Sequence, residues 1–430
     1  MISTYPTHKR SDIEWMEHIP SHWDELKGQF LLRKKDYNVG DAWISTPLLS
    51  LTQRGVIKKD INSGKGKTHS DYSTYQFVEK GDLIFCLFDI DETPRTVGLS
   101  SFEGMITSAY SVFEAINDND KKYLYYFFEF VDNCKGLKPY YSGMRKTVRP
   151  AEFLKILLPK PPKTEQRAIA AFLDRETQRI DSLIEEKQTF IKLLKEKRQA
   201  LISHVVTKGL NPSVEVQDSG IEWIGQVPKH WVCPSYKYVC EIYRGKFTHR
   251  PRNDPAMFDG IHPFIQTGDV ARAKNIISSY SQTLSDAGTE VSQLIPKGTL
   301  MMVITGAKIG STAILGFDSY APDSVVGFKA KPTIELSYLK YSLMAALPAL
   351  EQTSIQSTQP NLNIDRIGSL KTPLPPLDEQ VSIVNHIENQ LSNFETVLSA
   401  VEDSIKLLLE RRTSLISAAV TGKIDVREAV

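Results

Sequence analysis

Two stretches of the chain carry apolar residues at helical spacing, and neither contains a proline or glycine. The apolar positions of the first stretch are Ile169, Leu173, Ile180, Ile184, Ile191, Leu194, Leu201 and Val205. About 214 residues later, the same positions hold Ile383, Ile387, Phe394, Leu398, Ile405, Leu408, Leu415 and Ala419. Steps of three, four and seven residues form a heptad seam, which favours a left-handed coiled coil. The pattern therefore predicts two helices, each roughly 60 Å long at about 1.5 Å per residue, packed on each other.

A proline run precedes each predicted helix. It reads L-P-K-P-P-K-T-E-Q at Leu158–Gln166 and T-P-L-P-P-L-D-E-Q at Thr372–Gln380. Thr164 and Asp378 are expected N-caps, and the prolines stand just outside the helix, where a missing N–H costs nothing. The helices end in L-I-S-H-V-V-T and L-I-S-A-A-V-T, so about 50 residues repeat without a gap. The alternative is two unrelated amphipathic helices on separate cores, but the shared register would then be accidental.

A second repeat, offset by about 208 residues, opens each half of the chain. It reads D-I-E-W-M-E-H-I-P-S-H-W at Asp12–Trp23 and G-I-E-W-I-G-Q-V-P-K-H-W at Gly220–Trp231. Two tryptophans around a proline favour a clamp that holds an entry strand on a domain. The paired histidines, His22 and His230, leave a metal site as the less favoured alternative. Each half is then a clamp, a globular region, a proline run and a long helix.

The two globular regions share a mixed α and β pattern. In the first, residues 24–158, strands are expected at Tyr75–Val78, Asp82–Phe88, Thr96–Leu99 and Ala109–Ala115, with a helix at Lys121–Phe130. In the second, residues 232–371, His262–Val270 is expected to be a strand followed by a turn, and Lys297–Gly310 a buried strand ending in a glycine-rich turn. K-G-D-L-I-F at Lys80–Phe85 in the first region corresponds to the segment that begins at Lys297. Gly209–Gln217 is interpreted as a linker.

Polar loops of the two regions differ in chemistry. K-G-L-K-P-Y-Y-S-G-M-R-K-T-V-R at Lys135–Arg149 and Y-R-G-K-F-T-H-R-P-R at Tyr243–Arg252 are basic, aromatic and free of acids. T-S-I-Q-S-T-Q-P-N-L-N at Thr353–Asn363 is rich in amides. By the 214-residue offset, Gln359 corresponds to Arg145. Arginine binds phosphate or guanine, and amides recognise adenine edges. The simpler alternative for each basic run is a solvated loop.

A further glycine-rich segment, N-S-G-K-G-K-T at Asn62–Thr68, resembles part of a phosphate-binding loop. Ile61 stands where the first glycine of that motif is required, so a flexible basic loop is favoured. The candidate nucleic-acid contacts of the whole chain are therefore Lys65, Lys67, Tyr140, Tyr141, Arg145, Lys146, Arg149, Arg244, Lys246, Arg250, Arg252, Lys308, Gln356, Gln359 and Asn361.

Composition adds few constraints. Hydrophobic residues make up 41% and charged residues 24% of the chain, which is ordinary for a globular protein. The net charge of +1 gives no bulk electrostatic argument for nucleic acid, so any such argument depends on local clusters. A membrane span and a secretory signal are not expected, and the four cysteines have no usual zinc spacing. We therefore expect reduced thiols and a cytoplasmic location.

Catalytic motifs are missing from the sequence. It has no N/D-P-P-Y/F methyltransferase motif and no complete Walker A motif. After Pro322–Asp323, Glu335 is followed two residues on by Ser337 rather than by the lysine of a nuclease motif. These absences favour a protein without catalytic or metal-binding residues. A coiled-coil scaffold whose globular domains bind proteins is the main alternative, and a stand-alone nuclease is a weaker one.

The combination of these repeats resembles the specificity subunit of type I restriction–modification systems. The resemblance rests on the paired E-W-x₄-P-x-H-W and P-x-P-P-x-x-E-Q segments and the two L-I-S-x-x-V-T endings. It rests also on G-M-R-K-T-V-R-P and S-T-Q-P-N-L-N ahead of the two helices. It implies an α+β fold with two target-recognition domains of mixed β-sheet and helices, separated by two long helices in an antiparallel coiled coil. The boundaries expected are 1–158 for the first domain with its clamp, 159–208 for the first helix, 209–372 for the linker and second domain, and 373–430 for the second helix and tail.

The same resemblance implies function and partners. Each domain would read one half of a split double-stranded DNA target, and the coiled coil would set their spacing. Two adenine methyltransferase subunits using AdoMet would dock on the chain, and restriction–translocase subunits using ATP and Mg²⁺ would join them. This chain itself would hold no cofactor. Lys160 and Lys163 replace Leu374 and Leu377 of the second repeat, so docking at the two sites is expected to differ.

Overall fold

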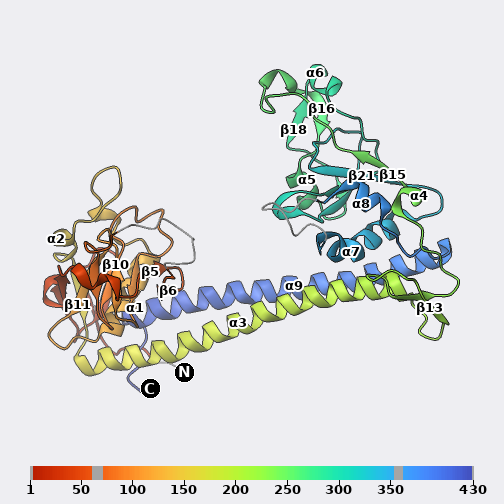
Figure 1. Ribbon diagram of the computed structural model, residues 1–430. Helices are drawn as coiled ribbons and strands as arrows, with labels where there is room; N and C mark the ends of the chain where they lie inside the picture. The colour runs from red at the N-terminus through yellow and green to blue at the C-terminus, as the bar shows by residue number, and fades with distance from the viewer. Residues whose placement is uncertain (1–2, 61–70, 353–361, 429–430) are drawn as a thin grey trace. The chain divides into compact units, whose positions relative to one another are not determined.

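The structure is a computed structural model that describes residues 3–60, 71–352 and 362–428. It divides into unit 1, Met1–Gln188 with Glu402–Val430, and unit 2, Thr189–Val401. Each unit holds one sheet-containing domain and a stretch of each long helix (Figure 1). The described residues therefore confirm the internal duplication that the sequence repeats predict.

The two long helices are α3, Lys163–Lys208, and α9, Leu377–Val420. Each begins one residue before its predicted cap, so Thr164 and Asp378 lie inside the first turn. The reason is that the carbonyl oxygens of Pro162 and Pro376 already accept hydrogen bonds from the backbone nitrogens of Gln166 and Gln380, at 2.9 and 3.0 Å. The last proline of each run therefore takes the capping position.

The seam residues of α3 and α9 are most buried where the helices meet a domain. In unit 1, Ile169 and Leu173 of α3 share a core with Ile416 and Val420 of α9. In unit 2, the end of α3 meets the beginning of α9, through Val205, Val206, Ile383 and Ile387. Each unit thus joins the start of one helix to the end of the other, as an antiparallel pair requires. The midsection residues Ile191, Leu194, Ile405 and Leu408 are only half-buried.

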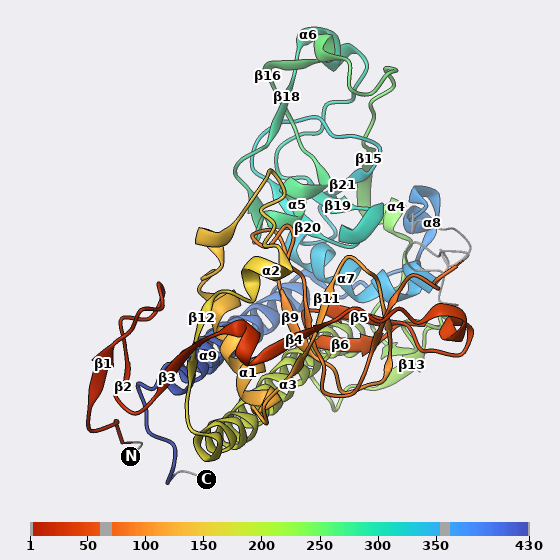
Figure 2. The same cartoon turned by 90° about the vertical axis from the view of Figure 1, so that its left-hand side faces the viewer.

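Unit 1 is built on a four-stranded antiparallel sheet in the order β4-β11-β8-β9. Helix α1, Lys121–Asn133, packs against this sheet and lies beside the long helices (Figure 2). The strands and the remaining helix of unit 1 are β1 His8–Arg10, β2 His18–Pro20, β3 Asp24–Lys27, β4 Leu32–Lys35, β5 Leu49–Thr52, β6 Gly55–Lys58, β7 Gln76–Val78, β8 Leu83–Phe85, β9 Val97–Leu99, β10 Gly104–Ile106, β11 Ser111–Ala115, β12 Leu157–Lys160 and α2 Pro150–Phe153. The strands and helix predicted for this region are confirmed.

Unit 2 repeats this sheet in the order β15-β21-β19-β20-β17, so its first four strands match those of unit 1, and β17 is added in parallel to β20. Unit 2 also contains short helices between its strands. Apart from the long helices, the strands and helices of unit 2 are β13 Val216–Asp218, β14 Gln226–Pro228, α4 Tyr236–Val239, β15 Cys240–Arg244, β16 Phe258–Phe264, α5 Thr267–Arg272, β17 Ile276–Ile277, β18 Gln282–Leu284, α6 Asp286–Glu290, β19 Leu300–Val303, β20 Thr312–Leu315, β21 Val325–Ala330, α7 Leu336–Gln352 and α8 Ile364–Ser369.

Two local predictions in unit 2 were wrong. The turn expected after the strand at His262–Val270 is helix α5, because Gln266 and Asp269 form a reciprocal capping box at its start. The end of the expected linker, Val216 and Gln217, belongs to strand β13, which pairs with β14 as β1 pairs with β2 in unit 1. The buried strand and glycine turn expected at Lys297–Gly310 are confirmed by β19 and the 3₁₀ turn Gly306–Lys308.

Each clamp segment contacts the glutamate that follows its own proline run. In unit 1, Glu165 accepts hydrogen bonds from Trp23 Nε1 at 2.8 Å and from the Tyr5 hydroxyl, and it pairs with His22 Nε2 at 2.8 Å. In unit 2, Glu379 accepts from Trp231 Nε1 at 3.0 Å and pairs with His230 Nε2 at 2.6 Å. The paired histidines thus contact a carboxylate, and Trp23 and Trp231 are buried as a clamp requires.

The glutamine that follows each glutamate anchors the adjoining domain. Gln166 Oε1 accepts from the backbone nitrogen of Asp120 at 2.8 Å, at the start of α1. Gln380 Oε1 accepts from the backbone nitrogen of Glu335 at 2.7 Å, at the start of α7. The E-Q pair therefore fixes both the clamp and the domain to the first turn of a long helix, and it does so in both units.

Candidate nucleic-acid interface

The basic segment of unit 1 forms a tight turn at the end of the central strand β8. Ser142 and Thr147 exchange backbone hydrogen bonds of 2.9 and 3.0 Å, which close the turn. The backbone nitrogen of Val148 then donates to the carbonyl oxygen of Leu87 at 2.9 Å, just beyond β8. The turn is thus anchored at the edge of the sheet, and the side chain of Met144 at its tip is fully exposed.

Acidic side chains of the loop after β8 face this basic turn. Arg145 Nη2 lies 2.6 Å from Asp89 Oδ2, and Lys146 Nζ lies 2.9 Å from Asp91 Oδ2 and 3.1 Å from Glu92 Oε1. Hydrogen bonds from Arg145 and Lys146 lower the pKa values of Asp89 and Asp91 below their usual range. The basic run is free of acids in sequence but is partly neutralised in the fold.

The other candidate residues of this segment differ in exposure. Tyr140 is half-buried and packs edge-to-face on Trp15, with ring centroids 6.2 Å apart. Tyr141 donates to Asp91 Oδ1 at 3.2 Å, and burial raises its pKa to about 12. Arg149 is exposed and has no ion-pair partner among the described residues. The arginines are therefore presented to solvent, while the tyrosines mainly support the turn.

In unit 2, basic side chains gather at the corresponding end of the sheet. Arg244, at the end of β15, and Arg252 line a cavity of about 520 Å³ together with Asn363, and Arg252 Nη2 lies 2.6 Å from Asp323 Oδ2. Lys246 and Lys308 are exposed. Arg250 Nη1 is turned toward its own chain and donates to the carbonyl oxygens of Phe247 and His249 at 3.1 and 2.8 Å.

Leu362, just before α8, contacts the unit 2 sheet as Val148 contacts the sheet of unit 1. The backbone nitrogen of Leu362 donates to the carbonyl oxygen of Ile304 at 2.9 Å, just beyond β19, as Val148 donates to Leu87 just beyond β8. Gln356, Gln359 and Asn361, and also Lys65 and Lys67, lie outside the described residues. Val148 and Leu362, which follow the basic and the amide-rich segment, therefore bond to equivalent positions just beyond β8 and β19.

Sequence reasoning missed the acidic partners Asp89 and Asp323. Asp89 lies 56 positions from Arg145 and Asp323 lies 71 from Arg252, so no local pattern connects either pair. The acidic run D-I-D-E at Asp89–Glu92, placed directly after a predicted strand, was the available signal.

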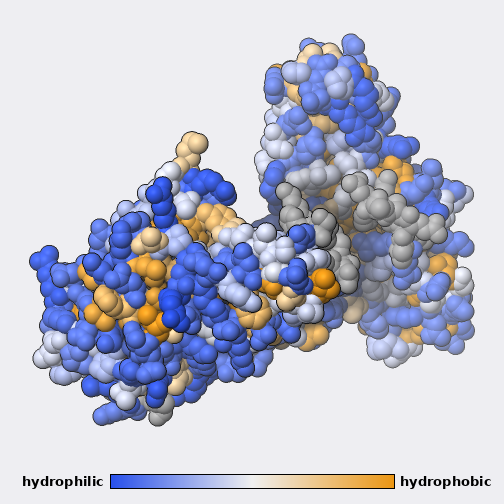
Figure 3. Space-filling view, turned by 60° about the vertical axis from the view of Figure 1, so that its left-hand side comes forward, coloured by the Kyte–Doolittle hydropathy of each residue, from blue (hydrophilic) through white to orange (hydrophobic). Residues whose placement is uncertain are grey.

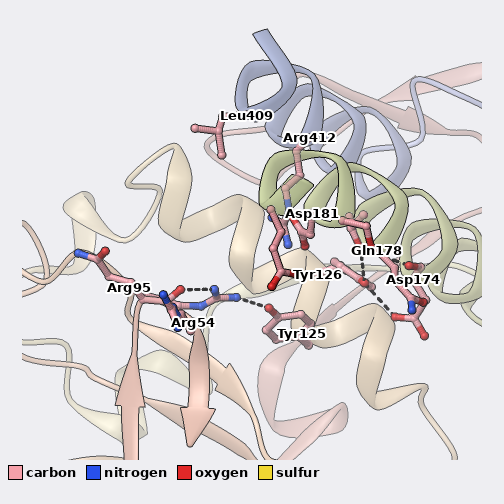
Figure 4. Close-up of a pocket in the computed structure, with 13 residues that line it drawn as sticks. Arg54, Arg95, Tyr125, Tyr126, Asp174, Gln178, Asp181, Leu409 and Arg412 are labelled. Carbon is pink, nitrogen blue, oxygen red and sulfur yellow. Dashed lines mark hydrogen bonds and ion pairs between the residues drawn. The ribbon is translucent and has the colours of Figure 1, made fainter. Parts of the chain in front are cut away.

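A second charged cluster of unit 1 lies between α1 and the two long helices (Figure 4). Arg412 of α9 donates to Glu129 of α1 at 2.7 Å and to Asp181 of α3 at 2.9 Å, and Arg95 lies 3.6 Å from Glu129. Arg95, Asp181 and Arg412 border a cavity of about 770 Å³. In unit 2, Arg198 and Glu395 line a similar cavity of about 570 Å³, but Met344 replaces the glutamate of the domain helix.

Among residues 3–60, 71–352 and 362–428, no group of three or more His, Cys, Asp or Glu side chains has an arrangement able to hold a metal ion. Within the same residues, no helix is long and apolar enough to cross a membrane.

Comparisons with known proteins identify a family and solved structures that this chain resembles. The family model described as "Type I restriction modification DNA specificity domain" matches residues 26–193 and again residues 228–406, which together make up most of the chain. Over most of its length the chain also resembles a chain from a structure described as "Structural basis underlying complex assembly and conformational transition of the type I R-M system". The TM-score is 0.69 at 16% identity, covering 94% of this chain and 99% of that one.

Two curated relatives are more limited matches. The chain is 22% identical over 285 residues to the type I restriction enzyme MjaVIII specificity subunit of Methanocaldococcus jannaschii. It is 22% identical over 296 residues to the type I restriction enzyme EcoKI specificity subunit of Escherichia coli. These matches cover 64% and 65% of this chain, and they span 64% and 60% of the two relatives.

Proposed function

Because the chain belongs to the family of type I restriction–modification DNA specificity domains, we propose that it recognises a split DNA sequence, with one half-site read by each unit. One observation carries this proposal. The two units share the order of four sheet strands, yet the segments that precede α2 in unit 1 and α8 in unit 2 carry different polar side chains. A constant scaffold with different loops is suited to reading two different sequences.

The candidate contacts fall into two chemical classes. Exposed arginines and lysines, such as Arg149, Arg244 and Lys246, suit phosphates or guanine, and the amides near Asn361 suit adenine. The chain itself carries out no chemistry in this proposal. Methylation of adenine N6 belongs to docked methyltransferase subunits that use AdoMet, and cleavage to restriction–translocase subunits that use ATP and Mg²⁺.

The long helices offer surface for docking those subunits. Most of the surface visible in Figure 3 is hydrophilic, with separate apolar patches. Large apolar side chains remain exposed on both helices, among them Phe190 and Leu193 on α3 and Leu407 and Leu409 on α9. The starts of the helices differ, since Lys163 pairs with Asp118 at 3.0 Å whereas Leu377 is exposed. Docking at the two starts is therefore expected to be unequal.

Modified-base sequencing tests the proposal. DNA from cells that make the chain with its methyltransferase partner is compared with DNA from cells lacking only this chain. A split motif carrying N6-methyladenine, present only with the chain, is the expected result. If the methylation pattern does not depend on the chain although the methyltransferase is active, the specificity role is rejected.

Binding of the assembled complex to duplex DNA then separates this function from a protein scaffold. Phosphate contacts release counterions, so affinity should fall steeply as salt is raised. Absence of DNA binding at low salt, with intact assembly, would favour the scaffold.

A further inference from the structure

The side chain of Arg145 is held in one orientation by two neighbours in the loop after β8. Its Nε and Nη2 atoms both donate to the carboxylate of Asp89, at 3.4 and 2.6 Å. Its guanidinium carbon lies 5.2 Å from the centre of the Phe88 ring. The carboxylate therefore occupies one edge of the guanidinium, and the aromatic ring covers one face.

The remaining edge of the guanidinium is presented outward. The Arg145 side chain is 70% exposed, and its Nη1 atom has no hydrogen-bond partner among the described residues. An arginine bound side-on through Nε and Nη2 keeps two N–H groups on Nη1 and one on Nη2, and one from each nitrogen points forward as a pair. Those two donors match the O6 and N7 acceptors of guanine in the major groove.

The backbone holds this arrangement in place. The backbone nitrogen of Asp89 donates to the carbonyl oxygen of Arg145 at 2.8 Å, so the two loops are joined at this pair. Lys146 and Tyr141 bind Asp91, which fixes the flanks of the same junction. An arginine positioned before binding loses less conformational entropy on contact, which favours base readout over a flexible phosphate contact.

We propose that Arg145 reads a guanine in the half-site bound by unit 1, and that Asp89 and Phe88 are positioning residues for it. This inference rests on the proposed function and adds the identity of the base. Arg149, on the same segment without an ion-pair partner among the described residues, is assigned to phosphate and serves as the matched control.

The test is modified-base sequencing of cells in which the full chain, with its methyltransferase partner, carries one substitution. Arg145→Ala should relax one G·C position of one half-site, reducing discrimination there by about 10- to 100-fold, while the other half-site stays unchanged. Arg145→Lys should relax the same position, because lysine lacks the paired donors. Arg149→Ala should lower methylation at all targets without changing the motif.

The positioning role of Asp89 is tested by asking whether the effect of its substitution requires Arg145. Asp89→Asn should relax the same G·C position more weakly, and Arg145→Ala with Asp89→Asn should match Arg145→Ala alone. A purely structural role of Asp89 would instead lower methylation without altering any single position. The unchanged half-site shows that each variant has folded.

Two results overturn the inference and leave the proposed function standing. One is a split wild-type motif in which Arg145→Ala lowers methylation at every target and changes no position, which would indicate a phosphate contact. The other is a motif whose unit 1 half-site specifies no G·C pair. If the wild-type chain directs no motif, the proposed function itself fails.

Discussion

At the residue scale, Glu165 and Glu379 show how a short motif organises a whole unit. Each carboxylate lies in the first turn of a long helix and accepts a hydrogen bond from the indole of a buried tryptophan. They differ in burial, since the side chain of Glu165 is 4% exposed and that of Glu379 is 39% exposed. The same motif is therefore expected to contribute more stability in unit 1.

Replacing Glu165 tests this difference. Glu165→Ala leaves Trp23 Nε1 and the Tyr5 hydroxyl without their acceptor and should lower the free energy of unfolding by about 2 to 4 kcal/mol. The matched Glu379→Ala should cost about 1 kcal/mol, because water replaces the exposed carboxylate. Denaturant unfolding of the full chain measures both. Equal losses would contradict the role of burial.

Two glycines allow the energetic cost of backbone strain to be distinguished from the cost of close packing. Gly422 and Gly143 have φ angles of +71° and +69°, but only Gly422 is crowded, because a Cβ there would lie 2.3 Å from Pro20. Gly143→Ala should cost about 1 to 2 kcal/mol through the left-handed backbone alone. Gly422→Ala should cost more, because the clamp must also move. Thermal unfolding compares the two, and a smaller effect at Gly422 would count against the close packing.

At the element scale, the first domain is tied to both long helices by charge as well as by apolar packing. Arg412 of α9 contacts α1 through Glu129 and α3 through Asp181, and its side chain is 19% exposed. The neighbouring carboxylates raise the pKa of Arg412 despite its burial, so it stays charged. Unit 2 has the corresponding Arg198, but no glutamate on its domain helix faces it, because Met344 takes that place.

Removing the Arg412 guanidinium should therefore be more damaging than removing that of Arg198. Arg412→Ala leaves Glu129 with Arg95 as its remaining cation and should cost about 3 kcal/mol. Arg198→Ala is expected to cost less than half as much. Adding Glu129→Gln to Arg412→Ala should recover part of the loss. Chemical unfolding of the wild type, Arg412→Ala, Arg198→Ala, Glu129→Gln and the double variant measures these effects, and additive effects of Arg412→Ala and Glu129→Gln would rule out the proposed coupling.

Sequence periodicity predicted the elements well, because a helix or strand is specified by neighbouring residues. The heptad positions from Ile169 onward identified α3, and K-G-D-L-I-F identified β8. Contacts between distant segments were not predictable in this way. Glu165 and Trp23 were each recognised as part of a repeat, but no local pattern indicated that they contact each other. The Arg145–Asp89 pair was missed for the same reason, because its two residues are far apart in the sequence. The α5 capping box was missed because Gln266 is an uncommon cap.

At the scale of the whole molecule, α3 and α9 each continue from one unit into the other, because the boundaries fall after Gln188 and Val401. The proposed spacing of the half-sites depends on the length of these two helices. A heptad keeps the seam in register, whereas an insertion of another length rotates it away from its partner.

Inserting seven residues into both helices, after Gln188 and after Val401, should lengthen the gap between the half-sites. The added rise is about 10 Å, which corresponds to roughly three base-pair steps at 3.4 Å each. Both half-sites should keep their sequences, since neither sheet is altered. Methylation-site sequencing reads the gap directly. An unchanged gap in an active variant would show that the helices do not determine the spacing.

The clamp of unit 1 also has a consequence for chain connectivity. The backbone nitrogen of Asp425 donates to the carbonyl oxygen of Ser3 at 2.7 Å, and His8 contacts the carbonyl oxygen of Gly422. By the two repeat offsets, Ser3 and Asp425 both correspond to Asn211, where the chain runs continuously from α3 into the clamp of unit 2. The contact between the two ends of the chain in unit 1 therefore corresponds to the continuous connection at Asn211 in unit 2. A circular permutant that connects the two ends of the chain through a short linker and opens near Asn211 should keep both units folded, because no helix or strand is interrupted.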